Sequence, residues 1–212
     1  MGRQFVASTV KGARALGWTD VGTDEADLVH RCAEGDDAAY GELVGLHQRM
    51  VFHLACHLLG NREEALDLSQ EVFLSVFRTV GSFRGQSSLR TWIYRIAINQ
   101  ARNRQRWWRR RHQSDQVSLA EHELAHGELR HPGDDARPDL VLARKQAAAR
   151  LWAALDRLPF DQRTAIVLRE FDGMSYEEIA YSLDIAVGTV KSRLTRARQA
   201  LRASLVEAGR PI

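Results

Sequence analysis

Hydrophobic residues between positions 40 and 58 recur at steps of three and four, the spacing that puts them on one face of an α-helix. Gly60 follows the last of them, and glycine is common directly after a helix. The pattern therefore predicts a helix over residues 40–58. Its predicted inner face consists of Tyr40, Leu43, Val44, His47, Met50, Val51, Leu54 and Leu58.

A second helix is predicted to begin directly after this glycine. Asn61 and Glu64 have the spacing of a capping box, in which two side chains bind the unpaired backbone N–H groups at the start of a helix. The residues of this helix that we expect to face inward are Ala65, Val72, Phe73, Val76 and Phe77.

The other side of the second helix carries a row of acidic and amide side chains, which we call the acidic stripe. Its members are spaced at i, i+4, i+7 and i+8, so they share one helix face. Such a row is either a solvated surface or a surface that binds a partner, and the residues by themselves leave both interpretations open. The acidic stripe consists of Glu63, Asp67, Gln70 and Glu71.

Gly81 and Gly85 interrupt the chain before a third predicted helix, which Ser87 or Ser88 can cap and which runs to about residue 111. The apolar face of this helix consists of Leu89, Trp92, Ile93, Ile96 and Ala97. A different face carries what we call the arginine row, which consists of Arg95, Asn99, Arg102 and Arg106.

Four more helices are predicted in the second half of the chain. The first is rich in alanine and ends at Pro159, which cannot continue a helix, and the second stops at Gly173. Ser175 and Glu178 form a capping box for a short third helix. A short helix, a tight turn and a long basic helix have the spacing of a helix-turn-helix motif. The predicted spans are 140–158, 161–171, 176–182 and a fourth helix that ends before residue 209.

The helical periods predict an all-α protein, and the composition is that of a soluble, intracellular globular chain. The 212 residues are 44% hydrophobic and 27% charged, and no run approaches the roughly 18 uncharged apolar residues of a membrane helix. Two cysteines are too few for a disulfide framework, and the first twenty residues do not resemble a signal peptide. We expect residues 1–23 to be a flexible extension.

The net charge of +3 conceals three segments of opposite sign. Residues 84–111 contain nine arginines and no acid, residues 113–139 carry a net charge of −5, and residues 187–206 carry +5. Because nine arginines without an acid repel one another, they favour a polyanionic partner over a solvated face. Lysine occurs only three times, and this bias towards arginine suits bidentate contacts to phosphates or bases.

The acidic segment also contains three residues that disfavour regular structure, and it lacks a sustained apolar period. We therefore interpret residues 113–139 as a flexible acidic linker between two small helical domains at residues 24–112 and 140–208. The residues that break its structure are Pro132, Gly133 and Pro138.

Catalytic and metal-binding motifs find little support. The chain has no phosphate-binding glycine loop and no nucleophile elbow, so we expect neither catalytic residues nor a cofactor nor a small-molecule substrate. Several histidines and cysteines have spacings that suggest metal ligands, but no second pair completes a tetrahedral site, and packing explains them as well. We expect no metal. These residues are His30, Cys32, His53, Cys56 and His57.

Three stretches of the chain resemble bacterial RNA polymerase sigma factors of the sigma-70 family, in particular the small extracytoplasmic-function group. The N-terminal core domain of that group is similar to NREEALDLSQEVFLSVFRTVGSF at residues 61–83 and SSLRTWIYRIAINQARNRQR at residues 87–106. Its promoter-reading C-terminal domain is similar to LPFDQRTAIVLREFDGMSYEEIAYSLDIAVGTVKSRLTRARQALR at residues 158–202. The matches follow the order and spacing of the family. Asp184 and Ala186 depart from its usual turn residues.

The resemblance implies a dissociable, non-catalytic initiation subunit that works in the bacterial cytoplasm, at the nucleoid when bound to polymerase. The acidic linker would thread through the polymerase, and an anti-sigma factor, often membrane-bound, would sequester the chain until a stress signal. Core RNA polymerase would be bound by Asp67, Gln70 and Glu71. The −10 element would be bound and held open by Trp92, Arg95, Asn99, Arg102 and Arg106.

The resemblance also implies that the last helix reads the −35 element in the major groove. A recognition helix needs short or forked donors near its start, and the residues from position 191 onward supply them. Base edges would be read by Lys191, Ser192, Thr195 and Arg196, with Arg193, Arg198 and Tyr176 closer to phosphates.

Two other functions remain open from the residues. A stand-alone helix-turn-helix repressor or activator would explain the second half but has no use for the acidic stripe, and an RNA-binding adaptor would prefer structured RNA. Trp107 and Trp108 lie outside the matching motifs and suit DNA stacking, contact with an inhibitor or packing on a neighbouring helix.

Overall fold

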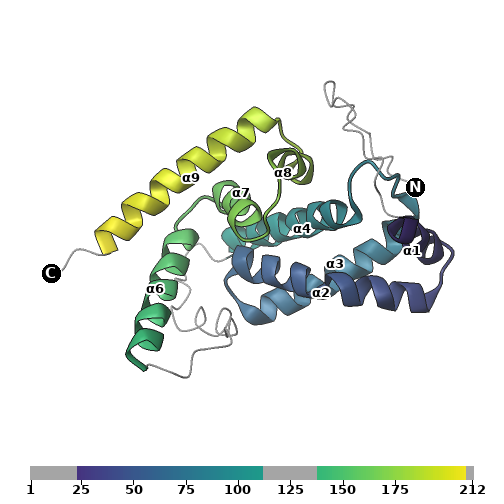
Figure 1. The fold of residues 1–212 in the computed structure, drawn as a ribbon, viewed down its shortest axis with the longest axis horizontal. Coiled ribbons are helices and arrows are strands. Elements are labelled where there is room, and N and C mark those ends of the chain that lie inside the picture. The colour runs from purple at the N-terminus through teal and green to yellow at the C-terminus, as the bar shows by residue number, and fades with distance from the viewer. Residues whose placement is uncertain (1–22, 112–137, 209–212) are drawn as a thin grey trace.

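The computed structural model (Figure 1) describes residues 23–111 and 138–208, all of whose regular elements are helical. This confirms the predicted all-α class. Nearly all of the predicted N-terminal extension and acidic linker lie outside the described residues. The N-terminal helices are α1 (Thr23–Ala33), α2 (Asp37–Leu59), α3 (Arg62–Thr79), the 3₁₀ turn η1 (Val80–Ser82) and α4 (Leu89–Arg111). The C-terminal helices are α6 (Pro138–Asp156), α7 (Phe160–Glu170), α8 (Tyr176–Leu183) and α9 (Val187–Ala208).

Local capping signals place most helix ends where the sequence predicted them. Gly60 ends α2 with a left-handed φ of 72°, a conformation that glycine adopts without a steric penalty. The side chain of Asn61 accepts a hydrogen bond from the Glu64 backbone N–H at 3.0 Å. The carboxylate of Glu64 faces Arg104 at 2.7 Å, so the reciprocal half of this predicted capping box is replaced by an ion pair. At Ser175 both halves of the box are present.

Helix α1 is an element that the sequence analysis missed. Its apolar residues Leu28 and Cys32 are one turn apart and buried. The carboxylate of Glu25 accepts a hydrogen bond from the backbone N–H of Leu89, one of the donors left unpaired at the start of α4. Helix α1 therefore stabilises the N-terminus of α4. The sequence does carry two signals of this helix, namely two acids in its first turn and the four-residue spacing of Leu28 and Cys32.

Most of the predicted inner face of α3 is buried, but the prediction for Phe77 was wrong. Ala65, Val72, Phe73 and Val76 are buried, whereas Phe77 is 50% exposed. The ring of Phe77 meets the ring of Tyr40 edge to face at 4.9 Å between centroids, near the surface. Because Phe77 lies one residue beyond Val76, it sits at the edge of the apolar face, where its ring is only partly covered.

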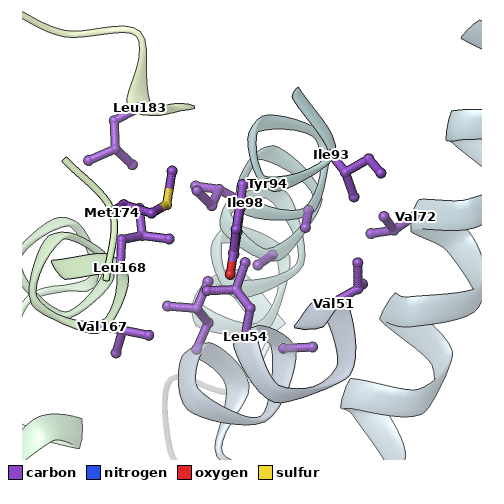
Figure 2. Close-up of a cluster of buried hydrophobic side chains, with 14 of the residues drawn as sticks. Val51, Leu54, Val72, Ile93, Tyr94, Ile98, Val167, Leu168, Met174 and Leu183 are labelled. Carbon is purple, nitrogen blue, oxygen red and sulfur yellow. The ribbon is translucent and has the colours of Figure 1, made fainter. Parts of the chain in front are cut away.

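The N-terminal and C-terminal helices pack against each other around α4 (Figure 1). One continuous hydrophobic cluster joins them, and Figure 2 shows side chains of α4 meeting side chains of α7 and α8 across it. At one end of the contact, the ring of His57 stacks on Trp152 at 4.8 Å and lies 5.0 Å from Phe171. Tyr94, Ile98 and Leu54 come from the N-terminal side of the cluster, and Val167, Leu168, Met174 and Leu183 from the C-terminal side.

We expect Ile98→Ala to lower the free energy of unfolding by about 2–5 kcal/mol, because the side chain is fully buried in the shared cluster and its removal leaves a cavity. Leu46→Ala is the matched control, since this leucine is 64% exposed and its truncation should change stability by less than about 0.5 kcal/mol. Urea unfolding of both variants measures the difference. Equal losses would contradict the packing described for α4.

Ser175→Ala removes the hydroxyl that accepts a hydrogen bond from the Glu178 backbone N–H at 3.1 Å. We expect a loss of about 1 kcal/mol, typical of an N-cap. Ser204→Ala, inside α9, is the control, and it should be neutral or slightly stabilising because alanine has the higher helix propensity. Thermal unfolding followed by circular dichroism compares them, and an unchanged midpoint for Ser175→Ala would argue against the cap.

Candidate nucleic-acid and polymerase interface

Helix α3 exposes the acidic stripe, although one of its members is already paired. Asp67, Gln70 and Glu71 are all exposed. Arg104 on α4 contacts the carboxylates of Glu71 and Glu64, each at 2.7 Å, and its side chain is only 17% exposed. Arg104 therefore holds Glu71 in place and offsets part of its negative charge. Of the two acids among the predicted polymerase contacts, Asp67 keeps more of its charge than Glu71 does.

A surface groove of about 660 Å³ lies beside the stripe, between α3 and the end of α4. Its walls include Leu74, Gln100, Trp107 and Trp108. The rings of the two tryptophans lie 6.1 Å apart, edge to face. Leu74 and Trp107 are 54% and 45% exposed, so an apolar surface borders the acidic one. The sequence analysis assigned Leu74 no role.

The arginine row lies along α4 as predicted, but half of it contacts the C-terminal helices. Asn99 and Arg106 are exposed. Arg95 lies 3.6 Å from the carboxylate of Asp184 and places its guanidinium over the ring of Tyr181 at 5.3 Å. The row is therefore not the open surface that its helical spacing indicated.

Arg102 and Trp92, the other predicted −10 contacts, are also partly covered. Arg102 pairs with Asp161 at 3.3 Å and lies over the ring of Phe160 at 5.8 Å. Trp92 is half-buried against the core, with its ring 5.4 Å from that of Phe83. The Trp92 ring therefore supports the base of α4, and only part of it faces solvent.

Helices α8 and α9 form the predicted helix-turn-helix. The connection between them passes through Asp184, whose φ of 56° is left-handed, a conformation that aspartate adopts more readily than most residues. The Ser192 hydroxyl donates to the Thr189 carbonyl at 2.9 Å and the Thr195 hydroxyl donates to the Lys191 carbonyl at 3.0 Å, which leaves their oxygens able to accept. The exposed residues of the first turns include Lys191, Ser192, Thr195 and Arg196.

The residues predicted to lie near phosphates have partners inside the protein. Arg193 pairs with Asp161 at 3.0 Å and is only 21% exposed. Arg198 pairs with Glu170 at 2.7 Å, and the hydrogen bonds that its guanidinium donates to the Glu170 carboxylate raise the pKa of Arg198. The ring of Tyr176 lies beneath the guanidinium of Arg169 at 5.0 Å.

Burial perturbs several titratable groups of the described residues. Burial raises the pKa of the Cys56 thiol to about 11 and that of the Cys32 thiol as well, so both stay protonated at neutral pH and are poor nucleophiles. Burial also raises the pKa of Tyr94 and of Asp172, whose side chains form a hydrogen bond. Tyr94 and Asp172 come from opposite sides of the contact between the two sets of helices, so their shifts follow from that packing.

The candidate metal ligands do not assemble. Within residues 23–111 and 138–208, no three histidine, cysteine, aspartate or glutamate side chains are grouped so that they could hold a metal ion. His57 stacks on Trp152, Cys32 and Cys56 are buried, and His30 lies 3.4 Å from Glu34 on the surface of α1.

In the same described ranges, every helix is too short or too polar to cross a membrane.

Comparison with known proteins finds matches to both sets of helices. The family model described as Sigma-70 region 2 matches residues 43–113, and the one described as Sigma-70, region 4 matches residues 148–201. The RNA polymerase sigma-H factor of Pseudomonas aeruginosa is 39% identical over 186 residues, which cover 86% of this chain and 95% of that protein. The ECF RNA polymerase sigma-E factor of Escherichia coli is 38% identical over 181 residues, covering 84% and 92%.

Two solved structures have a similar fold. CnrH in complex with the cytosolic domain of CnrY has a TM-score of 0.61 at 26% identity and covers 88% of this chain and 99% of its own. The sigma factor RpoE in complex with the anti-sigma factor NepR from Bartonella quintana also has a TM-score of 0.61, at 27% identity, with 81% and 98% covered. The chain therefore belongs to the extracytoplasmic-function group of the sigma-70 family, and it is a transcription initiation factor that directs RNA polymerase to promoters.

Proposed function

We propose that the chain divides its work between two domains, at residues 24–112 and 140–208. The first binds core RNA polymerase and the −10 element, and the second reads the −35 element. The matches of region 2 and region 4 to separate parts of the chain support this division. The observation that carries the proposal is the row of exposed donors on the first turns of α9, directly after a helix-turn-helix connection.

The acidic stripe is the proposed contact with core polymerase. Asp67 and Gln70 are exposed on α3, and Arg104 orients the carboxylate of Glu71 beside them. Leu74 and Trp107, exposed at the groove beside the stripe, add apolar surface that a partner helix could bury. A contact of this kind combines burial of apolar area with charges that select the partner.

The arginine row is the proposed contact with the −10 element. Guanidinium groups bind phosphates and stack on unpaired bases, which suits a strand that has been separated from its complement. Asn99 and Arg106 are exposed for such contacts, while Arg95 and Arg102 become available only when they leave Asp184 and Asp161. Trp92 supports the row from the half-buried side of α4.

Helix α9 is the proposed reader of the −35 element. Its exposed donors lie on its first turns, the part of a recognition helix that enters the major groove. Lys191, Ser192, Thr195 and Arg196 reach base edges, and Arg196 can bind a guanine with two hydrogen bonds. The proposed phosphate contacts are Arg193, Arg198 and Tyr176.

We also propose that the chain is not an enzyme, acts in the cytoplasm and at the nucleoid, and is held by an anti-sigma factor when inactive. The similarity to a sigma factor solved with the anti-sigma factor NepR supports that partner.

Transcription by core polymerase with the purified chain tests the proposal. We expect initiation at a defined set of promoters when genomic fragments are transcribed and the RNA 5′ ends are mapped. No specific initiation, together with tight duplex binding by the free chain, would instead favour a stand-alone helix-turn-helix regulator. A preference for structured RNA would favour an RNA-binding adaptor.

Arg196→Ala should reduce discrimination at one −35 position by about 1–3 kcal/mol, because one bidentate base contact is lost. Arg202→Ala is the control, since this arginine lies further along the same helix and is also exposed. The measurement is holoenzyme affinity for a promoter series with single −35 substitutions. An unchanged base preference for Arg196→Ala would remove this residue from the reading surface.

Asp67→Lys should weaken binding to core polymerase by at least about tenfold, because it reverses a charge at a partly desolvated contact while leaving the Arg104 to Glu71 pair intact. Asp37→Lys, an equal charge reversal at the start of α2, should bind as the parent does. Titration of labelled core polymerase measures both affinities. Parental affinity of Asp67→Lys would refute the assignment of the stripe.

A further inference from the structure

The side chains proposed to read the −35 element differ in what orients them. The hydroxyls of Ser192 and Thr195 donate to backbone carbonyls one turn earlier in α9, at 2.9 and 3.0 Å, so the helix itself orients them. Lys191 is exposed on the same helix and carries its ammonium group on a flexible four-carbon stem. A freely rotating lysine loses conformational entropy when it reaches a base, so a contact that holds it in advance strengthens its part in recognition.

The ring of Tyr176 supplies such a contact. The Nζ atom of Lys191 lies 6.0 Å from the centroid of this ring, at the outer limit of a cation–π interaction. The face of an aromatic ring is negative and attracts a cation. The ring therefore favours one direction for the lysine side chain.

Tyr176 is itself fixed at the start of α8. The capping box of Ser175 and Glu178 holds the backbone at this end of the helix, with hydrogen bonds of 3.1 and 2.8 Å. The ring is half-buried and packs against the hydrophobic cluster. Because both the backbone and the ring are held, Tyr176 can orient a side chain that comes from another helix.

Arg169 of α7 limits where Lys191 can lie on the ring. Its Cζ atom is 5.0 Å from the centroid of Tyr176, and its Nη1 atom donates to the carbonyl of Met174 at 2.7 Å. Two cations near one ring repel each other. The ring thus attracts Lys191 while Arg169 keeps it from moving further over the ring, which restricts the positions of the ammonium group.

The hydroxyl of Tyr176 has a different neighbour, so the ring and the hydroxyl can be tested separately. Arg198 donates two hydrogen bonds to one carboxylate oxygen of Glu170, at 3.2 and 2.7 Å. These bonds raise the pKa of Arg198, and the hydroxyl of Tyr176 adds to the shift. The hydroxyl is therefore associated with a proposed phosphate contact, whereas the ring is associated with Lys191.

We propose that Tyr176 is a positioning residue for −35 recognition, whose ring holds the ammonium group of Lys191 in the orientation that reaches a base edge. The hydroxyl keeps its proposed role beside the phosphates, and the ring sets how strongly Lys191 discriminates between bases. In the major groove, lysine binds the O6 and N7 acceptors of guanine. The inference rests on the proposed −35 role of Lys191.

Holoenzyme affinity for a promoter series with single −35 substitutions tests this role. Lys191→Ala first identifies the position that Lys191 reads, as the one at which base preference falls. We expect Tyr176→Leu to reduce the preference at that position about threefold, because the cation–π contact is lost. Tyr176→Phe keeps the ring, so it should keep this preference within about 1.5-fold while it weakens binding to all promoters alike.

Tyr176→Leu in the Lys191→Ala background completes a double-mutant cycle. Because the ring acts through the ammonium group, the second substitution should not change the preference at this position further. A ring that only supported the fold would lower the preference at several positions in both backgrounds, and that result would overturn the proposal. An unchanged preference in Tyr176→Leu, with weaker binding to every promoter, would also overturn it and would leave Tyr176 as a phosphate contact alone.

Tyr181→Leu is the matched control, because it truncates a second half-buried tyrosine of α8, whose ring lies under Arg95 of α4. It should leave the −35 preferences as they are in the parent. Leucine keeps apolar volume against the cluster, so Tyr176→Leu should fold, which thermal unfolding followed by circular dichroism checks. Tyr176→Met, with a flexible side chain that fills the same space without a ring, repeats the test independently.

The same series separates this proposal from the function on which it rests. Unchanged −35 preferences in Lys191→Ala, in a holoenzyme that still starts at defined promoters, would reject the positioning role and keep the proposed function. A parent holoenzyme without any promoter preference would reject the proposed function itself.

Discussion

The burial of helix α4 between the N-terminal and C-terminal helices is the contact on which the rest of the structure depends. Ile93 packs towards α2 and α3, while Tyr94 and Ile98 extend the core towards α7 and α8. With two faces of the helix occupied in this way, the polar residues of α4 must lie at the edges of the contact. The arginine row therefore borders the C-terminal helices, and its position follows from how the core is shared.

Features that depend on residues adjacent in the sequence could be predicted, whereas features that depend on packing between residues far apart in the sequence could not. Gly60 ends α2 and the capping box of Ser175 and Glu178 begins α8, both as predicted, because each signal depends on only a few adjacent residues. Phe77 was misplaced because its burial depends on which side of α3 the neighbours cover. Helix α1 was missed because it is only 11 residues long and buries few side chains.

The same division applies to the candidate site. The exposure of Lys191 and Arg196 follows from helical periodicity, and the structure agrees with it. The covering of Arg102 could not be read from the sequence, because its partner Asp161 is 59 residues away and belongs to a segment with its own helical pattern. A spacing rule identifies which side chains share a face, but it does not identify what lies opposite that face.

The bias towards arginine suits side chains that pair with an acid while they rest on an aromatic ring. Arg95 pairs with Asp184 while its plane rests on Tyr181, and Arg102 pairs with Asp161 over the ring of Phe160. A planar guanidinium makes both kinds of contact at once, whereas the compact ammonium group of lysine is more strongly hydrated and lacks the plane. The features that favour stacking on aromatic rings inside the protein are the same ones that favour stacking on unpaired bases.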